Sequence, residues 1–290
     1  MDLCNINDIK PLLARHGFRF SKSLGQNFLI QGWVPQDIAY ASGCDEESGV
    51  LEIGPGIGPL TVQLAKRAGR VAAIELDKDL LPILAETLAG YDNVTVIPGD
   101  VMKLDLPALV REQFTGLTPQ LSPMVCANLP YNITTPVLTL LLESGLFSVI
   151  TVMIQKEVAQ RICASPGSKD YGAFTVLCRY YADTELLFDV PRECFLPAPK
   201  VTSAVVKLTP HAPPACVHDE KIFFQVVRGA FGLRRKTLLN ALGSAFPLEK
   251  DTLRDAIDAA GLAPEIRGEK LGIPEFAALA DEIKARLHNS

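Results

Sequence analysis

The sequence lacks any run of about 18 apolar residues, the length that a membrane-spanning helix needs. Its first residues also lack the basic-then-apolar pattern of a secretory signal. We therefore expect a cytoplasmic protein that does not contact a membrane. Hydrophobic residues make up 48% of the 290 residues and charged residues 21%, a composition typical of a globular protein with a large core.

The sequence also lacks the spacings of disulfide frameworks and zinc sites. Its seven cysteines are odd in number and scattered, and no two of them form a C-x-x-C pair. Reduced, mostly buried thiols are the simplest interpretation. Cys216, His218 and His211 lie close together in the sequence, but their spacing matches no zinc pattern. We therefore expect no metal site.

Positive charge is not in excess, since the formal net charge is −5. A protein that coats nucleic acid by charge alone would be basic, so this class is disfavoured. The charge is uneven, however. Residues 1–199 carry 15 Lys and Arg against 22 Asp and Glu, whereas residues 200–290 carry 13 against 11.

The C-terminal part contains a basic cluster, namely Arg228, Arg234, Arg235 and Lys236, in a nine-residue span without an acidic residue. A locally basic and globally acidic chain is typical of a site-specific RNA contact. Near the N-terminus, Lys22 and Arg19 are second candidates for such a contact.

Short apolar runs alternate with helical patterns over the first 200 residues. Five runs predict buried strands and two later ones are rich in β-formers: residues 50–53, 71–74, 94–97, 124–127, 149–154, 184–190 and 201–208. This alternation predicts an α/β fold with a mostly parallel sheet of about seven strands. The proline-rich segment 210–214 is typical of a linker, and the apolar periodicity after it predicts a small helical domain. We therefore predict two domains, residues 1–209 and 210–290.

A glycine-rich turn follows the first predicted strand. Gly54, Gly56 and Gly58 lie between that strand and a helix, which lets the backbone approach a ligand closely. Their spacing differs from G-x-G-x-x-G, so the tight pyrophosphate turn of dinucleotide-binding proteins is not reproduced. In addition, none of the four histidines lies in a cluster at strand ends. Both observations disfavour a nicotinamide-dependent dehydrogenase, and the glycine spacing favours a ligand without phosphate.

Two acidic residues mark the ends of the next two predicted strands. Glu75 lies 21 residues after Gly54, where a carboxylate can accept hydrogen bonds from both hydroxyls of a ribose. Asp100 ends the third strand, where it can meet the amine of an adenine on the same ligand. Because ligands bind at the carboxyl ends of parallel strands, these residues predict a ligand with ribose and adenine.

The tetrapeptide Asn128-Leu129-Pro130-Tyr131 follows the fourth predicted strand. It places an amide, two backbone carbonyls and an aromatic ring at the edge of the sheet where ligands bind. Such a group suits a flat ring that carries an amine, because the carbonyls accept from the amine and the aromatic ring stacks on the face. By itself, Asn-x-Pro also marks an ordinary turn.

Several segments, in chain order, carry a family resemblance: residues 23–29, 51–61 with Glu75, 99–100, 128–131, 155–159, 195–201 and 234–237. With them the chain resembles class I S-adenosylmethionine-dependent methyltransferases and, among these, the rRNA adenine dimethyltransferase family. The resemblance implies a Rossmann-like sheet with a C-terminal all-helical domain. It also implies that residues 1–209 bind S-adenosylmethionine and catalyse the reaction, and that residues 210–290 bind RNA.

S-adenosylmethionine is the cofactor that the resemblance implies, without a metal. The implied cofactor contacts are Asn27, Leu29, Gly54, Gly56, Glu75, Asp100, Val101 and Asn128. Of these, the physical interpretation given above independently favours Glu75 and Asp100.

The tetrapeptide and one further aromatic residue are the implied catalytic group. An adenine amine is a poor nucleophile because its lone pair is delocalised into the ring. If the Asn128 side chain and the carbonyl of Leu129 or Pro130 accept its two hydrogens, the lone pair can turn toward the sulfonium methyl, so positioning supplies most of the catalysis. We expect Tyr131 to stack on one face of the target base and Phe195 on the other.

The resemblance is closest to bacterial enzymes that dimethylate the N6 atoms of two adjacent adenines in a hairpin loop near the 3′ end of 16S rRNA, a step linked to small-subunit biogenesis. It implies 16S rRNA in the small ribosomal subunit or its precursor as the partner. The basic residues Lys22, Arg228, Arg234, Arg235 and Lys236 are then expected to bind phosphates. Nothing in the sequence requires a protein partner or more than a monomer.

Two alternatives stay open. One is the antibiotic-resistance type of enzyme, which methylates an adenine of 23S rRNA. The other is a ribosome-assembly factor that acts mainly by binding.

Overall fold

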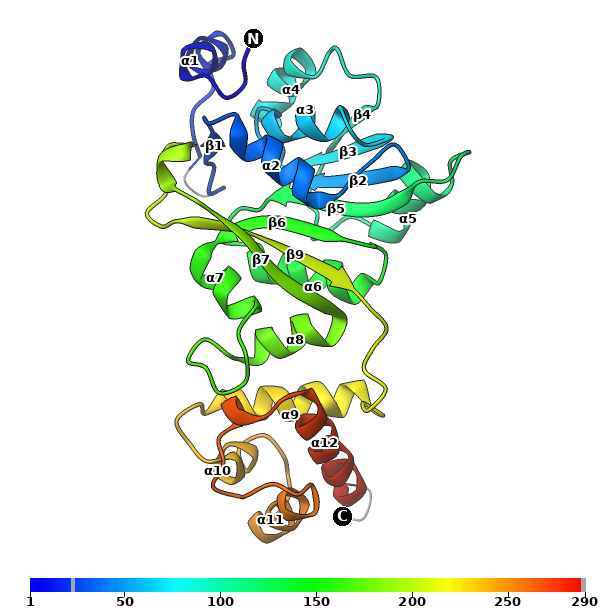
Figure 1. The fold of residues 1–290 in the computed structure, drawn as a ribbon, viewed down its shortest axis with the longest axis vertical. Helices are drawn as coiled ribbons and strands as arrows, with labels where there is room; N and C mark the ends of the chain where they lie inside the picture. Colours follow the sequence, from blue (N-terminus) through cyan, green and yellow to red (C-terminus); the bar gives the residue numbers. More distant parts are fainter. Residues whose placement is uncertain (22–23, 288–290) are drawn as a thin grey trace. The chain divides into compact units, whose positions relative to one another are not determined.

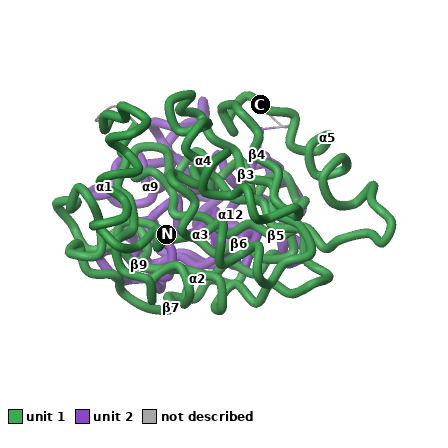
Figure 2. The backbone as a smooth tube through the Cα atoms, turned by 90° about the horizontal axis from the view of Figure 1, so that it is seen from above, with its two compact units in different colours: residues 1–159, 183–210 green, residues 160–182, 211–290 purple. Residues whose placement is uncertain are grey.

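The computed structural model describes residues 1–21 and 24–287 (Figure 1). The chain divides into two compact units, residues 1–159 with 183–210 and residues 160–182 with 211–290 (Figure 2). The first unit contains a β-sheet flanked by helices, and the second is built of helices. No helix among the described residues has the length and apolar character to span a membrane.

A seven-stranded sheet forms the centre of the first unit. Its strands, in spatial order, are β4 (Val94–Pro98), β3 (Arg70–Glu75), β2 (Ser48–Ile53), β5 (Ser122–Asn128), β6 (Ile150–Gln155), β9 (Ser203–Pro210) and β7 (Ala182–Val190). The strands from β4 to β6 pair in parallel, and β9 pairs antiparallel with β6. The predicted α/β fold with a mostly parallel sheet of about seven strands is confirmed.

The strand order reverses beside β2. The chain passes from β2 to β3 and β4 on one side, and then crosses to β5 and β6 on the other. At such a point the connections leave in opposite directions, so a crevice opens outside the carboxyl ends of the strands. Gly54, which follows β2, and Asn128, which ends β5, therefore flank one crevice.

Helices accompany the sheet. They are α1 (Ile6–Arg15), α2 (Trp33–Ser42), α3 (Pro59–Ala65), α4 (Leu81–Thr87), α5 (Leu106–Val110), α6 (Thr134–Ser144) and α7 (Lys156–Ile162), with the short helical turns η1 (Lys78–Leu80), η2 (Arg111–Thr115) and η3 (Arg192–Cys194). Helices α2 and α3 cover one face, since Ile38 and Leu64 share a buried cluster with Val50 and Met153 of the sheet. Every residue of β2 is buried, as expected for a parallel strand covered on both faces.

A second, two-stranded sheet joins segments that lie far apart in the sequence. Strand β1 (Phe28–Leu29) pairs antiparallel with β8 (Phe195–Leu196), and Leu29 lies opposite Phe195. The backbone N–H of Ile30 also donates to the carbonyl of Cys194 at 2.8 Å. This pairing anchors the N-terminal segment against the body of the first unit.

The second unit consists of α8 (Ala173–Tyr181), α9 (Glu220–Gly232), α10 (Leu238–Leu242), α11 (Lys250–Ala259) and α12 (Ile273–Leu287), with the turn η4 (Gly268–Lys270). The predicted division at residue 210 assigned residues 160–182 to the first domain, whereas here they group with the C-terminal helices. The reason is packing. Val176 and Tyr180 of α8 share a buried cluster with Phe223 of α9, and the Tyr171 hydroxyl donates to the carbonyl of Leu271 at 2.8 Å.

Candidate active site

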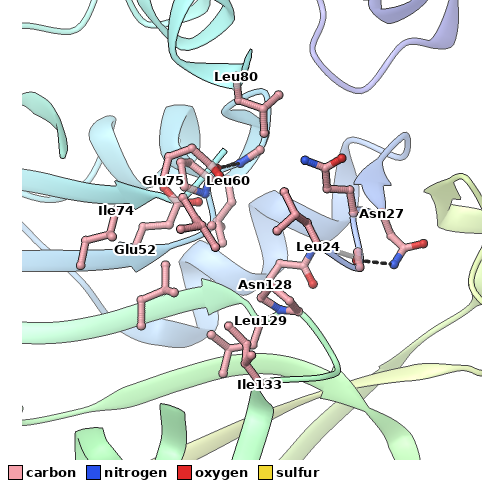
Figure 3. A pocket seen from close by; sticks show the side chains of 18 of the residues that line it. Leu24, Asn27, Glu52, Leu60, Ile74, Glu75, Leu80, Asn128, Leu129 and Ile133 are labelled. Carbon is pink, nitrogen blue, oxygen red and sulfur yellow. Dashed lines mark hydrogen bonds between the residues drawn. The ribbon is translucent and has the colours of Figure 1, made fainter. Parts of the chain in front are cut away.

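A cavity lies at the carboxyl ends of the parallel strands of the first unit (Figure 3). It is lined by residues 24–29, 52–57, 59–60, 74–76, 80, 99–101 and 128–133. Its walls come from the ends of β2, β3, β4 and β5 and from the segment that leads into β1. All eight residues predicted to contact the cofactor lie in it: Asn27, Leu29, Gly54, Gly56, Glu75, Asp100, Val101 and Asn128.

The glycine turn after β2 forms the floor between two of these walls. Gly54 and Gly56 have positive φ values of +70° and +63°, a backbone conformation that side chains disfavour. A Cβ atom on Gly56 would lie 3.3 Å from the ring of Phe28, and one on Gly54 would lie 3.8 Å from Pro130. Glycine therefore keeps this part of the cavity free of side chains while the backbone lies close to β1 and to the turn after β5.

Glu75 ends β3 with its carboxylate held by backbone donors. One oxygen, Oε1, accepts from the N–H of Asp77 at 2.8 Å, and the other, Oε2, accepts from the N–H of Gly56 at 3.3 Å. The residue is only 6% exposed, and burial raises the pKa of Glu75, against the effect of these two bonds. Each oxygen keeps a second lone pair, so the fixed carboxylate can accept from two neighbouring hydroxyls.

Asp100 and Val101 follow β4 on the same edge of the sheet. The Asp100 carboxylate accepts from the N–H of Met102 at 3.0 Å and faces the Nζ of Lys103 at 3.6 Å. Val101 is 3% exposed and adds an apolar surface beside the carboxylate. A carboxylate next to an apolar surface suits a flat ring that carries an amine.

The segment before β1 closes the cavity from the N-terminal side. The Asn27 amide donates to the carbonyl of Gly25 at 2.9 Å, which shapes a tight turn. The Gln26 side chain bridges two segments, donating to Asp77 at 2.6 Å and accepting from the N–H of Ser21 at 2.8 Å. Gln26 thus ties this wall to the residues that follow Glu75, a role that the sequence did not indicate.

The tetrapeptide Asn128-Leu129-Pro130-Tyr131 begins at the last residue of β5 and forms the turn that was one of its two interpretations. The carbonyl of Pro130 accepts from the N–H of Ile133 and from the hydroxyl of Thr134, both at 3.2 Å. Its two lone pairs are therefore engaged within the turn. The sequence left two backbone acceptors open, the carbonyls of Leu129 and Pro130. No described residue donates a hydrogen bond to the Leu129 carbonyl, so this is the one that remains available to a ligand.

Asn128 and Tyr131 differ in how they are held. The Asn128 side chain makes no hydrogen bond to any residue that the structure describes, although it lines the cavity. The Tyr131 hydroxyl, by contrast, lies 2.6 Å from the hydroxyl of Ser203 on β9. The site therefore offers a free amide next to an anchored aromatic ring.

Glu52 is a cavity residue that sequence reasoning missed. It is 1% exposed, and its Oε2 atom has no hydrogen-bond partner among the described residues. Burial, with a smaller contribution from the Glu75 charge, raises the pKa of Glu52 to about 8. The only signal in the sequence was an acidic residue inside an otherwise apolar strand.

One residue of the predicted catalytic group, Phe195, does not line the cavity. Phe195 is 2% exposed and packs in the cluster that contains Leu29, Val34 and Cys194, so its ring lies behind the wall and not in it. Stacking of Phe195 on a base would require its ring to leave this core. Lys22 lies outside the described residues.

The predicted RNA-binding residues of the second unit lie at the end of α9 and in the turn after it. Arg228, Arg234, Arg235 and Lys236 are all exposed. The Arg234 guanidinium is partly engaged, because it donates to Glu269 at 3.3 Å and to the carbonyl of Lys169. The other three make no ion pair with any residue in the described part of the chain. They are available to contact an anionic partner.

A family model described as ribosomal RNA adenine dimethylase matches residues 17–284. The chain belongs to this family. Ribosomal RNA small subunit methyltransferase A of Geobacillus thermodenitrificans is 48% identical over 287 residues, which cover 97% of each chain. A dimethyladenosine transferase structure from Plasmodium falciparum matches with a TM-score of 0.72 and 26% identity, covering 89% of this chain and 98% of that one. The structure of the 23S rRNA methyltransferase ErmE matches with a TM-score of 0.64 and 25% identity, covering 89% of this chain and 100% of that one.

Family membership confirms the predicted enzyme class. The protein is an S-adenosylmethionine-dependent rRNA adenine methyltransferase. The cavity suits this cofactor on geometric grounds as well. It combines a fixed carboxylate at the tip of β3, a second one after β4, and a glycine turn that leaves room for a ligand between them.

Proposed function

We propose that the protein transfers methyl groups from S-adenosylmethionine to the N6 atoms of two adjacent adenines in a hairpin loop near the 3′ end of 16S rRNA. The products are N6,N6-dimethyladenosines, formed during small-subunit biogenesis. The protein acts in the cytoplasm as a monomer, on 16S rRNA within the small subunit or its precursor. The relatives support this assignment. The chain is 48% identical to a relative named ribosomal RNA small subunit methyltransferase A, but only 25% identical to the 23S rRNA methyltransferase ErmE.

The observation that carries the proposal is the turn after β5. It presents the free Asn128 amide and the Leu129 carbonyl at the cavity, while the Pro130 carbonyl is engaged by Ile133 and Thr134. Two acceptors next to a ring are what an adenine amine requires, since the amine donates two hydrogens and the base has a flat face.

These acceptors activate the amine by orienting it. When Asn128 Oδ1 and the Leu129 carbonyl each accept one hydrogen, the nitrogen becomes more tetrahedral and its lone pair leaves conjugation with the ring. Because the acceptors are fixed before the base arrives, the gain comes from positioning and preorganised dipoles. The bound cofactor would supply an electrophilic methyl group on its sulfonium. Transfer would break the S–CH3 bond and form the N6–CH3 bond, with the neutral thioether as leaving group and one N6 proton released to water.

The remaining cavity residues bind the cofactor beside this amine. Glu75 accepts from the two ribose hydroxyls, and Asp100 accepts from the adenine amine of the cofactor, with Val101 against its ring. Asn27, Leu29, Gly54 and Gly56 form the surrounding wall. This assignment rests on the carboxylate geometry and on the open floor at the glycine turn.

The target base has to leave its stack to reach the cavity. Tyr131 then stacks on one of its faces, an interaction worth about 1–3 kcal/mol. Phe195 remains a candidate for the other face, provided that its ring moves out of the core. Arg228, Arg235 and Lys236 of the second unit bind phosphates and so determine the register of the RNA.

The decisive experiment incubates the protein with labelled S-adenosylmethionine and small subunits from cells that lack the modification. We expect two methyl groups on each of two adjacent adenines, located by nuclease digestion and mass spectrometry. Label on 23S rRNA in parallel reactions with large subunits would instead assign the protein to the antibiotic-resistance type. Binding to small subunits without transfer would favour an assembly factor.

A further inference from the structure

One buried hydroxyl next to the active site has no role in the proposed reaction. Ser203 is fully buried at the first position of β9, and its Oγ lies 2.6 Å from the phenolic oxygen of Tyr131. The two residues are 72 positions apart in the sequence. The bond therefore links the turn after β5 to the other side of β6.

The anchor is rigid because Ser203 is part of the central sheet. It lies opposite Gln155 in the antiparallel pairing of β6 and β9. Just before it, the carbonyl of Thr202 accepts from the N–H of Lys156 at 3.0 Å. The hydroxyl thus has a fixed position relative to β6, which in turn pairs with β5.

Tyr131 is held at both ends by this arrangement. Its backbone belongs to the turn closed by the Pro130 carbonyl, and its hydroxyl bonds to Ser203. With an ordinary pKa of 10 the phenol is already neutral at physiological pH, and burial raises the pKa of Tyr131 further, so either hydroxyl can donate in this bond. A ring fixed at its Cβ atom and at its hydroxyl keeps one position and one direction of its long axis, whereas a phenylalanine ring would be held only at its backbone.

We propose that Ser203 is a positioning residue for methyl transfer: it fixes the position of the Tyr131 ring on which the target adenine stacks. The proposal rests on the proposed function, because it requires a base at Tyr131. Correct stacking orients the amine toward Asn128 and Leu129, so a mobile ring lowers the rate of transfer without affecting the cofactor wall. Ser203 acts through Tyr131 and does not touch the base.

A double-mutant cycle tests this role. The variants are Ser203→Ala, Tyr131→Phe and the combination of both, and the measurement is single-turnover methyl transfer to small subunits at saturating S-adenosylmethionine. Each single variant should be roughly tenfold slower, which corresponds to the loss of about one hydrogen bond. The double variant should be no slower than the slower single variant, because both changes remove the same bond.

Two controls separate positioning from a general loss of structure. Affinity for S-adenosylmethionine should be unchanged in all three variants. Ser144→Ala removes a serine hydroxyl that donates to the carbonyl of Leu141 at 2.7 Å on α6, and it should transfer methyl groups at the wild-type rate. Losses that multiply in the double variant, or single variants as fast as the wild type, would overturn the proposal.

The tyrosine ring can also be observed directly, without RNA. The chain has six tyrosines, so a spectrum of protein labelled with ¹³C in the tyrosine rings is simple, and Tyr131→Phe identifies the Tyr131 signal. In Ser203→Ala that signal alone should shift and broaden. An unchanged signal would refute the anchor, whereas a wild-type protein that transfers no methyl groups would refute the proposed function.

Discussion

Glu52→Gln should stabilise the protein increasingly as the pH rises from 5 to 8. In the folded protein the Glu52 carboxyl is 1% exposed, one of its oxygens has no partner among the described residues, and burial raises its pKa to about 8. In the unfolded chain the same group ionises near its ordinary value of 4.5. Glutamine has nearly the same shape and never ionises, so it removes this difference between the two states.

The magnitude follows from the two pKa values. Below pH 4.5 both states hold the proton, and the wild type suffers no penalty from this group. Between 4.5 and about 8 the unfolded state releases the proton that the folded state retains, so stability falls by up to about 1.4 kcal/mol for each pH unit. Above pH 8 the penalty is constant, at most about 5 kcal/mol, and internal relaxation around the carboxylate reduces it to a few kcal/mol.

Urea unfolding followed by circular dichroism at pH 5, 6, 7, 8 and 9 measures the effect. The difference in unfolding free energy between Glu52→Gln and wild type should grow with pH up to about 8 and then level off. Glu47→Gln changes an exposed carboxyl just before β2 and should show a flat difference. A flat profile for Glu52→Gln as well would mean that Glu52 is ionised in the folded protein, and the argument from burial would fail.

Three further predictions concern the site. Asn128→Ala should slow methyl transfer at saturating cofactor by about 10²–10³-fold, because one preorganised acceptor of the amine is lost; an undiminished rate excludes that role. Gly56→Ala should lower the unfolding free energy by about 1–2 kcal/mol and weaken S-adenosylmethionine binding in calorimetry, since a Cβ at positive φ is strained. Gly90→Ala, where a Cβ meets open space, is its control. Arg235→Ala with Lys236→Ala should reduce the slope of log K for RNA binding against log salt concentration by roughly 1–2. An unaltered slope would mean that these two residues do not contact the RNA.

The residues that line the cavity could be predicted from the sequence because their position depends on one rule. Gly54, Glu75, Asp100 and Asn128 each lie at or just after the end of a strand, and the carboxyl ends of parallel strands share one edge of the sheet. Recognising four strands in order was therefore enough to bring the four residues together. The structure confirms that they line one cavity.

Contacts between elements were not predictable in the same way. The sequence shows that α8 has an apolar face. It does not show that this face packs with Phe223 of α9 and so joins residues 160–182 to the helical unit. Likewise, the expected stacking of Phe195 on a base requires its ring to be accessible, whereas the ring is buried in a cluster with Leu29, which lies opposite it in the pairing of β1 with β8. Periodicity reports that a side chain is apolar, not which partner covers it.

The sequence by itself determined the enzyme family, the α/β sheet and the residues at the strand ends, because these depend on local patterns and on chain order. Only the tertiary structure decided which of two carbonyls in the turn after β5 remains open, that Glu52 is buried with a raised pKa, and that Ser203 holds Tyr131. Each of these depends on atoms from segments that meet only when the strands pair. Hydrogen bonding and burial act over a few ångströms in space, whatever the distance along the chain.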